Sequence, residues 1–393
     1  MSIKYPENLK IIAKILYENG YRSYAVGGCI RDAVMGRIPN DWDMTTSCSP
    51  EKMMEIFKRS DLHTFPYGIK HGTVSILLGR ECYECTTFRI DGNYTDSRHP
   101  DKVIFTDELS EDLRRRDFTV NAMAGDPLSE DGEIVDIFGG RADIEGKIIR
   151  AVGDPEKRFT EDALRILRAV RFATVLDFEI ESETRRAAQA LAYRLSYVSA
   201  ERKSVELKKI LLSDHADRGV SLLIETDTAK YIHPDMKLPK VPLSSLPLRF
   251  STRLAAIFDG IPELSIMKLP GEVVKQTRLL CDDDFYAETV SKFTEKGARA
   301  RYVLSKYRDI AEDAALLRGD ASLAEKISEE RSKEPCIAIS QLAINGNDLL
   351  SVGIEGRKLG AIISSLLLSV IENPELNKKE KLIEMALETV RGD

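Results

Sequence analysis

The hydrophobic pattern changes its period near residue 140, and this change limits the possible folds more than any other feature of the sequence. Between about residues 21 and 90, short strand-like runs such as YRSYAV, HGTVSILL and ECYECTTFR alternate with helical segments. From Arg141 nearly to the end the spacing is helical, as in SAERKSVELKKILLS and NKKEKLIEMALETVR. The pattern therefore predicts an α+β chain, in which a head with a small mixed sheet precedes an all-helical remainder.

Length and composition narrow the class of protein. A chain of 393 residues with 43% apolar residues suggests two to four folded domains. The sequence contains no run of about 18 apolar residues, and residues 1–20 read as an amphipathic helix ending at Gly20 rather than a secretory signal. Six scattered cysteines fit a reducing compartment. We therefore expect a cytoplasmic protein that does not enter membranes. The formal charge of −7 lowers the expectation of nucleic-acid binding but does not describe local patches.

Two aspartates one residue apart, in the DWDM segment, form the first candidate site. On a strand, Asp41 and Asp43 would point to the same side, where their charges repel unless a cation lies between them. Oxygen ligands without histidine or cysteine favour Mg²⁺ over zinc, and Glu84 on another expected strand offers a third carboxylate. Such a group suits nucleotidyl transfer with two metal ions. An isolated DxD pair is more often a solvated turn.

A glycine pair just upstream changes that balance. Gly27 and Gly28 follow an expected strand and precede a short helix that carries Arg31. A turn of this kind offers backbone N–H groups to a phosphate, and the arginine adds a charged donor. The spacing matches neither the GxGxxG dinucleotide motif nor the GK-containing P-loop. The segment thus places a triphosphate site and a metal site close together.

The segment FTEDALRILRAVRF is the second candidate site, and its spacing predicts one helix. Arg165, Arg168 and Arg171 lie three residues apart, and Asp162 precedes Arg165 by about one turn. A salt-bridged helix surface explains this pattern as well as a binding site does. Beside a nucleotide site, however, a carboxylate with a guanidinium complements the pairing edges of cytosine and adenine and not those of guanine or uracil.

Taken together, the motifs VGGCIRD, NDWDMTTS, YECTTFR, RRRDFTVNAMA, DIFGGRADI, RFTEDALRILRAVRF and SAERKSVELKKIL resemble those of bacterial class II tRNA nucleotidyltransferases, the CCA-adding enzymes, in the tRNA nucleotidyltransferase/poly(A) polymerase family. The resemblance implies that Asp41 and Asp43 bind the catalytic metals, taken as Mg²⁺, with Glu84 as the third acidic residue. It also implies a base-reading pair, Asp162 and Arg165. The other nucleotide-binding residues that it implies are Gly28, Arg31, Arg116, Arg168, Arg171 and, for the ribose, Asn121.

The resemblance also predicts a division into parts and a set of partners. The expected parts are a catalytic head (1–140), a neck for base recognition (141–205), and a body (206–310) and tail (311–393) for tRNA binding. The partners would be CTP, ATP and the acceptor arm and 3′ end of tRNA. The tail segment GIEGRKLG departs from the usual form of the family, which leaves the tail contacts less defined.

Three alternatives remain open at this stage. An A-adding enzyme or a poly(A) polymerase would share the same motifs, although the basic and aromatic insertion expected of a poly(A) polymerase is not evident. The polar segment DGNYTDSRHPD, residues 91–101, is expected to form a mobile loop that helps the pocket change from C to A, and it argues against a CC-only enzyme. A non-catalytic tRNA-binding protein is disfavoured because all three carboxylates are intact.

Overall fold

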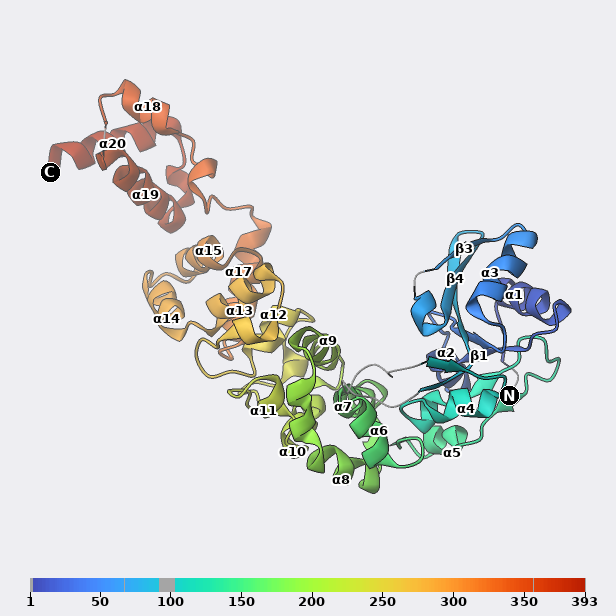
Figure 1. Cartoon of the computed structure of the whole chain (residues 1–393). Helices are drawn as coiled ribbons and strands as arrows, with labels where there is room; N and C mark the ends of the chain where they lie inside the picture. Colours follow the sequence, from blue (N-terminus) through green and yellow to red (C-terminus); the bar gives the residue numbers. More distant parts are fainter. Residues whose placement is uncertain (1–2, 67, 92–102, 356, 393) are drawn as a thin grey trace. The chain divides into compact units, whose positions relative to one another are not determined.

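The computed structural model describes residues 3–66, 68–91, 103–355 and 357–392, and these form two compact units, Met1–Pro234 and Asp235–Asp393. All strands of the described part lie in the first unit, and the second unit is built from helices (Figure 1). The predicted α+β class, with a sheet-containing head before a helical remainder, is therefore confirmed. The finer division at residues 140, 205 and 310 stays a prediction.

A seven-stranded mixed sheet organises the head. Its order is β3-β4-β5-β2-β1-β8-β9, in which β2 and β5 are parallel and the other neighbours are antiparallel. The strands are β1 (Ser23–Val26), β2 (Met44–Thr46), β3 (His63–Phe65), β4 (Thr73–Leu78), β5 (Glu81–Thr87), β8 (Ala124–Gly125) and β9 (Ile134–Val135). Two further pairs, β6 (Arg89–Asp91) with β7 (Val103–Phe105) and β10 (Ile148–Ile149) with β11 (Glu179–Ile180), lie outside it.

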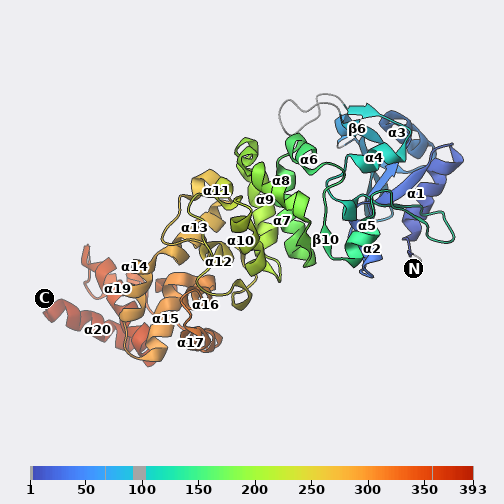
Figure 2. The ribbon, with the colours of Figure 1, turned by 90° about the horizontal axis from the view of Figure 1, so that it is seen from below.

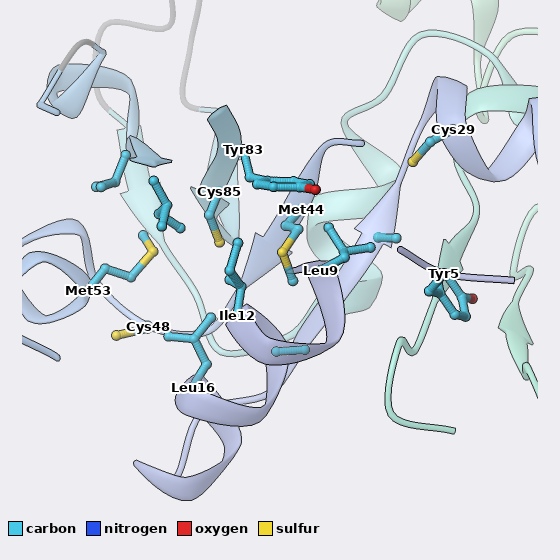
Figure 3. Close-up of a cluster of buried hydrophobic side chains, with 14 of the residues drawn as sticks. Tyr5, Leu9, Ile12, Leu16, Cys29, Met44, Cys48, Met53, Tyr83 and Cys85 are labelled. Atoms are coloured by element: carbon cyan, nitrogen blue, oxygen red, sulfur yellow. The ribbon is translucent and has the colours of Figure 1, made fainter. Parts of the chain in front are cut away.

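The main core of the head lies between one face of this sheet and two helices, α1 (Glu7–Glu18) and α3 (Pro50–Arg59). The first helix ends as predicted, because Gly20 adopts φ +86°, a conformation that favours glycine. The second is started by Ser49, whose hydroxyl accepts from the Lys52 N–H, and by Pro50 in its first turn. Figure 3 shows the side chains that meet in this core, among them Leu9, Ile12, Leu16, Met44, Met53 and Cys85.

The other face of the sheet carries a smaller cluster of apolar side chains, and it is the face on which the polar candidate site lies. Alternation along β1 puts Ala25 in the main core, whereas Val26 packs with Leu113 of α4 (Leu109–Arg114). The short helix α2 (Gly28–Val34) follows β1 directly, and α5 (Gly140–Glu145) ends the head. This face therefore has room for polar residues that the main core excludes.

Helices form the rest of the first unit, and the predicted helix over FTEDALRILRAVRF is wrong in one respect. It is two helices, α6 (Pro155–Glu161) and α7 (Leu164–Leu176), separated at Asp162, which has extended backbone angles (φ −141°, ψ 105°). The carboxylate of Asp162 accepts from the Leu164 N–H at 3.0 Å, and this local bond competes with helix continuation. The remaining helices are α8 (Ser182–Ala190), α9 (Ala200–Leu211), α10 (Ala216–Glu225) and α11 (Ala229–Ile232); Figure 2 shows α7, α9 and α10 packed side by side.

A buried arginine connects three helices of the second unit. The helices of this unit are α12 (Phe250–Ala255), α13 (Gly271–Cys281), α14 (Asp283–Ser291), α15 (Lys296–Tyr307), α16 (Ala311–Leu316), α17 (Ala321–Ser332), α18 (Gly346–Ser351), α19 (Arg357–Glu372) and α20 (Lys379–Gly392). Arg301 of α15 pairs with Glu330 of α17 at 2.7 Å and donates to the carbonyls of Ile371 and Glu372 at the end of α19. One side chain thus links three helices and satisfies carbonyls at a helix end.

Candidate active site

The register of the sheet brings two of the predicted carboxylates side by side. Met44 of β2 lies opposite Cys85 of β5 in a parallel pair, and both side chains are buried in the main core. The residues before them, Asp43 and Glu84, therefore lie next to each other on the opposite face. The carbonyl of Asp43 accepts from the Val26 N–H at 2.9 Å, which fixes this carboxylate beside the end of β1.

The sequence predicted that both aspartates lie within a strand. In the structure they come just before the strand begins. The strand β2 begins at Met44, after Asp41 and Asp43. Trp42 between them packs toward the main core, with its ring centroid 5.6 Å from that of Tyr5. Because Trp42 faces the core, the aspartates on either side of it lie away from the core, although they are not paired in a strand.

The electrostatics of Asp43 indicate a crowded group of negative charges. Burial raises the pKa of Asp43, and the charges of Glu84 and Asp41 raise it further, whereas Arg116 lowers it. A cation between the carboxylates would relieve this repulsion, and the oxygen donors fit Mg²⁺. Across the residues that the structure describes, no three His, Cys, Asp or Glu side chains are grouped closely enough to hold a metal ion.

The glycine turn lies beside these carboxylates and between two guanidinium groups. Gly27 has φ +78° and ψ −131°, which strongly favours glycine, and Gly28 begins α2. A Cβ atom on Gly27 would lie 3.2 Å from Arg116 Nη1, and one on Gly28 would lie 3.5 Å from Arg31 Nη2. Arg116 and Arg31, two of the arginines predicted to contact the nucleotide, therefore flank the turn.

A fully buried aspartate that the sequence reasoning missed holds Arg116 in place. Asp112 of α4 accepts from Arg116 at 3.1 Å and from Arg115 at 2.7 Å, and it also accepts from the Thr45 hydroxyl. Burial raises the pKa of Asp112, but the two arginines outweigh it and keep that pKa below its usual range. Asp112 stays ionised and orients the arginine at the turn.

A second missed aspartate links the turn to the helical part. Arg31 donates to the amide oxygen of Asn121 at 2.7 Å, and Asn121 donates to Asp117 at 3.4 Å. Asp117, the acidic member of the RRD motif, also pairs with Arg168 at 2.6 Å. Burial raises the pKa of Asp117, but the charges of Arg168 and Arg165 hold it below its usual value. Three predicted residues are thus joined by one residue that the sequence had not singled out.

Three of the predicted arginines lie close to one aromatic ring. The guanidinium groups of Arg31, Arg168 and Arg171 lie 5.4, 5.3 and 3.8 Å from the ring centroid of Phe172, which is a cation–π arrangement. Arg171 also pairs with Glu206 of α9 at 2.5 Å.

The proposed base-reading pair is present, but its two members have separate partners. Asp162 is bound by Arg202 of α9 through two hydrogen bonds of 2.7 and 3.3 Å. Arg165 pairs with Glu161 at 2.7 Å and donates to the carbonyl of Arg115 at 3.0 Å. Both partners lay within motifs already visible in the sequence, TED and SAERK, although nothing local assigned them. The predicted loop of residues 91–101 lies outside the described residues, apart from Asp91 at the end of β6.

A group of carboxylates beside a glycine turn, carried by a small mixed sheet, is the arrangement expected of a nucleotidyltransferase head. Consistent with this, residues 23–150 match the family model described as the poly(A) polymerase head domain, and residues 177–238 match a probable RNA- and SrmB-binding site of polymerase A. No helix in the described ranges has the length and apolarity needed to cross a membrane.

Similarity to curated and solved proteins specifies the family further. The chain is 36% identical to the CCA-adding enzyme of Levilactobacillus brevis, covering 96% of this chain and 97% of the relative, and 35% identical to that of Bacillus subtilis, covering 96% of each. The crystal structure of the Bacillus stearothermophilus CCA-adding enzyme in complex with CTP is 31% identical and covers 99% of each chain, with a TM-score of 0.81. The chain belongs to the family of CCA-adding enzymes, which are tRNA nucleotidyltransferases.

Proposed function

We propose that this protein adds C, C and A in turn to the 3′ end of tRNA, using CTP and ATP and releasing pyrophosphate. The observation that carries the proposal is the placement of Asp43 and Glu84 beside the Gly27–Gly28 turn, with Arg31 and Arg116 on either side of it. A polyanion bound at the turn would have its phosphorus atoms close to the carboxylates. This is the arrangement that nucleotidyl transfer needs.

In the proposed reaction, the terminal ribose 3′-hydroxyl of tRNA attacks the α-phosphate of the nucleotide. A bond forms between the 3′-oxygen and the α-phosphorus, the bond from that phosphorus to the bridging oxygen of the β-phosphate breaks, and the hydroxyl proton passes to solvent. Mg²⁺ held by Asp41 and Asp43 would stabilise the negative charge on the attacking 3′-oxygen and on the bridging oxygen that leaves. Arg31 and Arg116 bind the phosphates, and Gly28 lets the backbone approach them.

Base choice is assigned to Asp162 and Arg165. The carboxylate would accept from the amino group of cytosine or adenine, and the guanidinium would donate to the adjacent ring nitrogen. Arg202 and Glu161 support this role, because each holds one of the two groups through an ion pair of 2.7 Å. Arg168 and Arg171 complete the nucleotide pocket, and Asn121 contacts the ribose.

The acceptor arm of tRNA is proposed to bind through lysine and arginine side chains of the predicted body (206–310) and tail (311–393), whereas the predicted neck (141–205) serves base recognition. Binding of this kind weakens as salt rises, even for a protein with net charge −7. The proposed compartment is the cytoplasm, where the free cysteines of the described chain would stay reduced.

The test is nucleotide addition to tRNA transcripts that end before the CCA sequence, after CC and after CCA, with CTP and ATP supplied singly and together. Addition of all three nucleotides to the shortest transcript, stopping at CCA, is expected. A single A added only to the CC-ended transcript would identify an A-adding enzyme instead. The Asp41→Ala variant should lose activity, whereas Asp107→Ala on the exposed surface should retain it; equal activity of wild type and Asp41→Ala would contradict the assigned metal site.

A further inference from the structure

The first unit contains a cavity of about 1170 Å³ that no step described above uses. Its walls come from the end of α2 and the residues after it, the turn between α5 and β10, the C-terminal half of α7, the last turns of α9 and the start of α10. We infer that this cavity is the exit path for the pyrophosphate released by the proposed reaction. The inference thus rests on the proposed function.

The cavity shares one residue, Arg171, with the predicted nucleotide pocket. Along α7 the rise from Arg165 to Arg171 is about 9 Å, roughly the reach from a base to its outer phosphates. Arg171 shares the Phe172 ring with Arg31 and Arg168, and it is also part of the cavity wall. With the base at Arg165 and the phosphates at Arg31, as proposed above, Arg171 marks the point at which the leaving group would enter the cavity.

The charges of the cavity favour a small polyanion. Arg37, Lys147, Lys208 and Lys209 line it together with Arg171. The acidic groups facing this region are Glu206, which pairs with Arg171, and Asp177 and Asp214 near the start of α10. Asp177 is itself balanced by Arg218 at 3.5 Å and has His215 at 3.9 Å. Basic side chains outnumber acidic ones in the lining, and this composition favours anions over cations.

The apolar walls explain why the cavity would pass pyrophosphate rather than retain it. Val175 and Val205 expose 41% and 52% of their surface, and both line the cavity with Leu212. Aliphatic groups provide no hydrogen-bond donor for a phosphate oxygen, so this part of the wall adds nothing to the attraction by the basic side chains. A product path needs this combination, because tight binding would slow release.

Lys208 and Lys209 have a second physical explanation that the test must separate. They lie in the last turn of α9, where a positive charge also stabilises the negative end of the helix dipole. Lys147 follows the end of a different helix, α5, and precedes β10, so it probes the cavity from an element other than α9. A helix-stability role would leave every pyrophosphate-dependent quantity unchanged.

The experiment uses the full chain with inorganic pyrophosphate as the probe. By microscopic reversibility, pyrophosphate enters for the reverse reaction along the path by which it leaves. The variants are Lys208→Gln/Lys209→Gln and, separately, Lys147→Gln, with Lys10→Gln/Lys14→Gln on α1 as the control of matched charge change. The measurements are single-turnover incorporation, the inhibition constant for pyrophosphate and the second-order rate of pyrophosphorolysis.

We expect the cavity variants to keep the single-turnover rate within about two-fold, to raise the inhibition constant and to slow pyrophosphorolysis by about 3- to 10-fold, with a weaker salt dependence than the wild type. The control should match the wild type. An unchanged second-order rate of pyrophosphorolysis in both cavity variants would overturn the inference, as would a change confined to the KM for tRNA, which would mark an RNA surface. Absence of pyrophosphate release by the wild type would instead refute the proposed function.

Discussion

Replacing Gly27 by alanine tests the conformation of the glycine turn on which the whole site depends. Gly27 combines φ +78° with ψ −131°, approximately the mirror image of an extended residue, and a side chain there is strained at a cost of about 1–3 kcal/mol. The new methyl group would also lie 3.2 Å from Arg116 Nη1. That guanidinium is tied to buried Asp112, so it moves less freely than an ordinary surface side chain.

Together the two effects predict a loss of about 2–3 kcal/mol in the free energy of unfolding of the first unit. For a unit of this size that corresponds to a decrease of about 4–12 °C in Tm. Trp42 is the single tryptophan of the chain, and it packs against Tyr5 in the head core, so its fluorescence reports unfolding of this unit without interference from the second.

Two other glycines provide matched controls. Gly79 has φ +67° but nothing within 4 Å of an added Cβ, so Gly79→Ala measures backbone strain alone, about 1–2 kcal/mol. Gly28 has no positive φ, so Gly28→Ala should change stability by less than about 0.5 kcal/mol while lowering activity, since its methyl group would lie 3.5 Å from Nη2 of Arg31, which is proposed to bind the phosphates. If Gly27→Ala were as stable as the wild type, the reasoning about this turn would be refuted.

Three further predictions concern the partners of the arginines. Asp112→Asn should lower the free energy of unfolding by about 3 kcal/mol in denaturant titrations, because it leaves Arg115 and Arg116 without a buried counter-charge, whereas exposed Asp107→Asn should not. The pKa of Asp117 is lowered in the folded state, so its stabilising contribution is complete above the unfolded-state pKa of about 3.9 and is lost as pH falls through the lower folded-state pKa. The stability difference between wild type and Asp117→Asn should therefore shrink below about pH 4. A difference that stays constant with pH would contradict the pairing. Arg202→Gln removes the bidentate partner of Asp162 and should raise KM for CTP and ATP by about 10-fold with little change in kcat, with partial rescue by Arg202→Lys; a fall in kcat alone in steady-state assays would exclude a positioning role for Arg202.

The predicted helix over FTEDALRILRAVRF shows where a sequence pattern stops being sufficient. The periodicity of the arginines identified α7 correctly, because spacing along one helix is a local property. It did not reveal the break at Asp162, which depends on a side chain competing for a single backbone N–H group. In the same way, the DWDM segment was predicted to lie on a strand, but the strand begins only at Met44.

The sequence by itself determined the change from a mixed sheet to helices and the glycine turn, and it supplied the residues predicted for the site. These follow from short-range rules: side-chain alternation, helical spacing and the backbone freedom of glycine. Only the tertiary structure decided which charges meet. Asp162 pairs with Arg202, forty residues away, and Asp117 pairs with Arg168, fifty-one residues away. Any arginine can neutralise any aspartate, so charge alone does not select the partner; packing of distant elements places one of them within hydrogen-bonding distance.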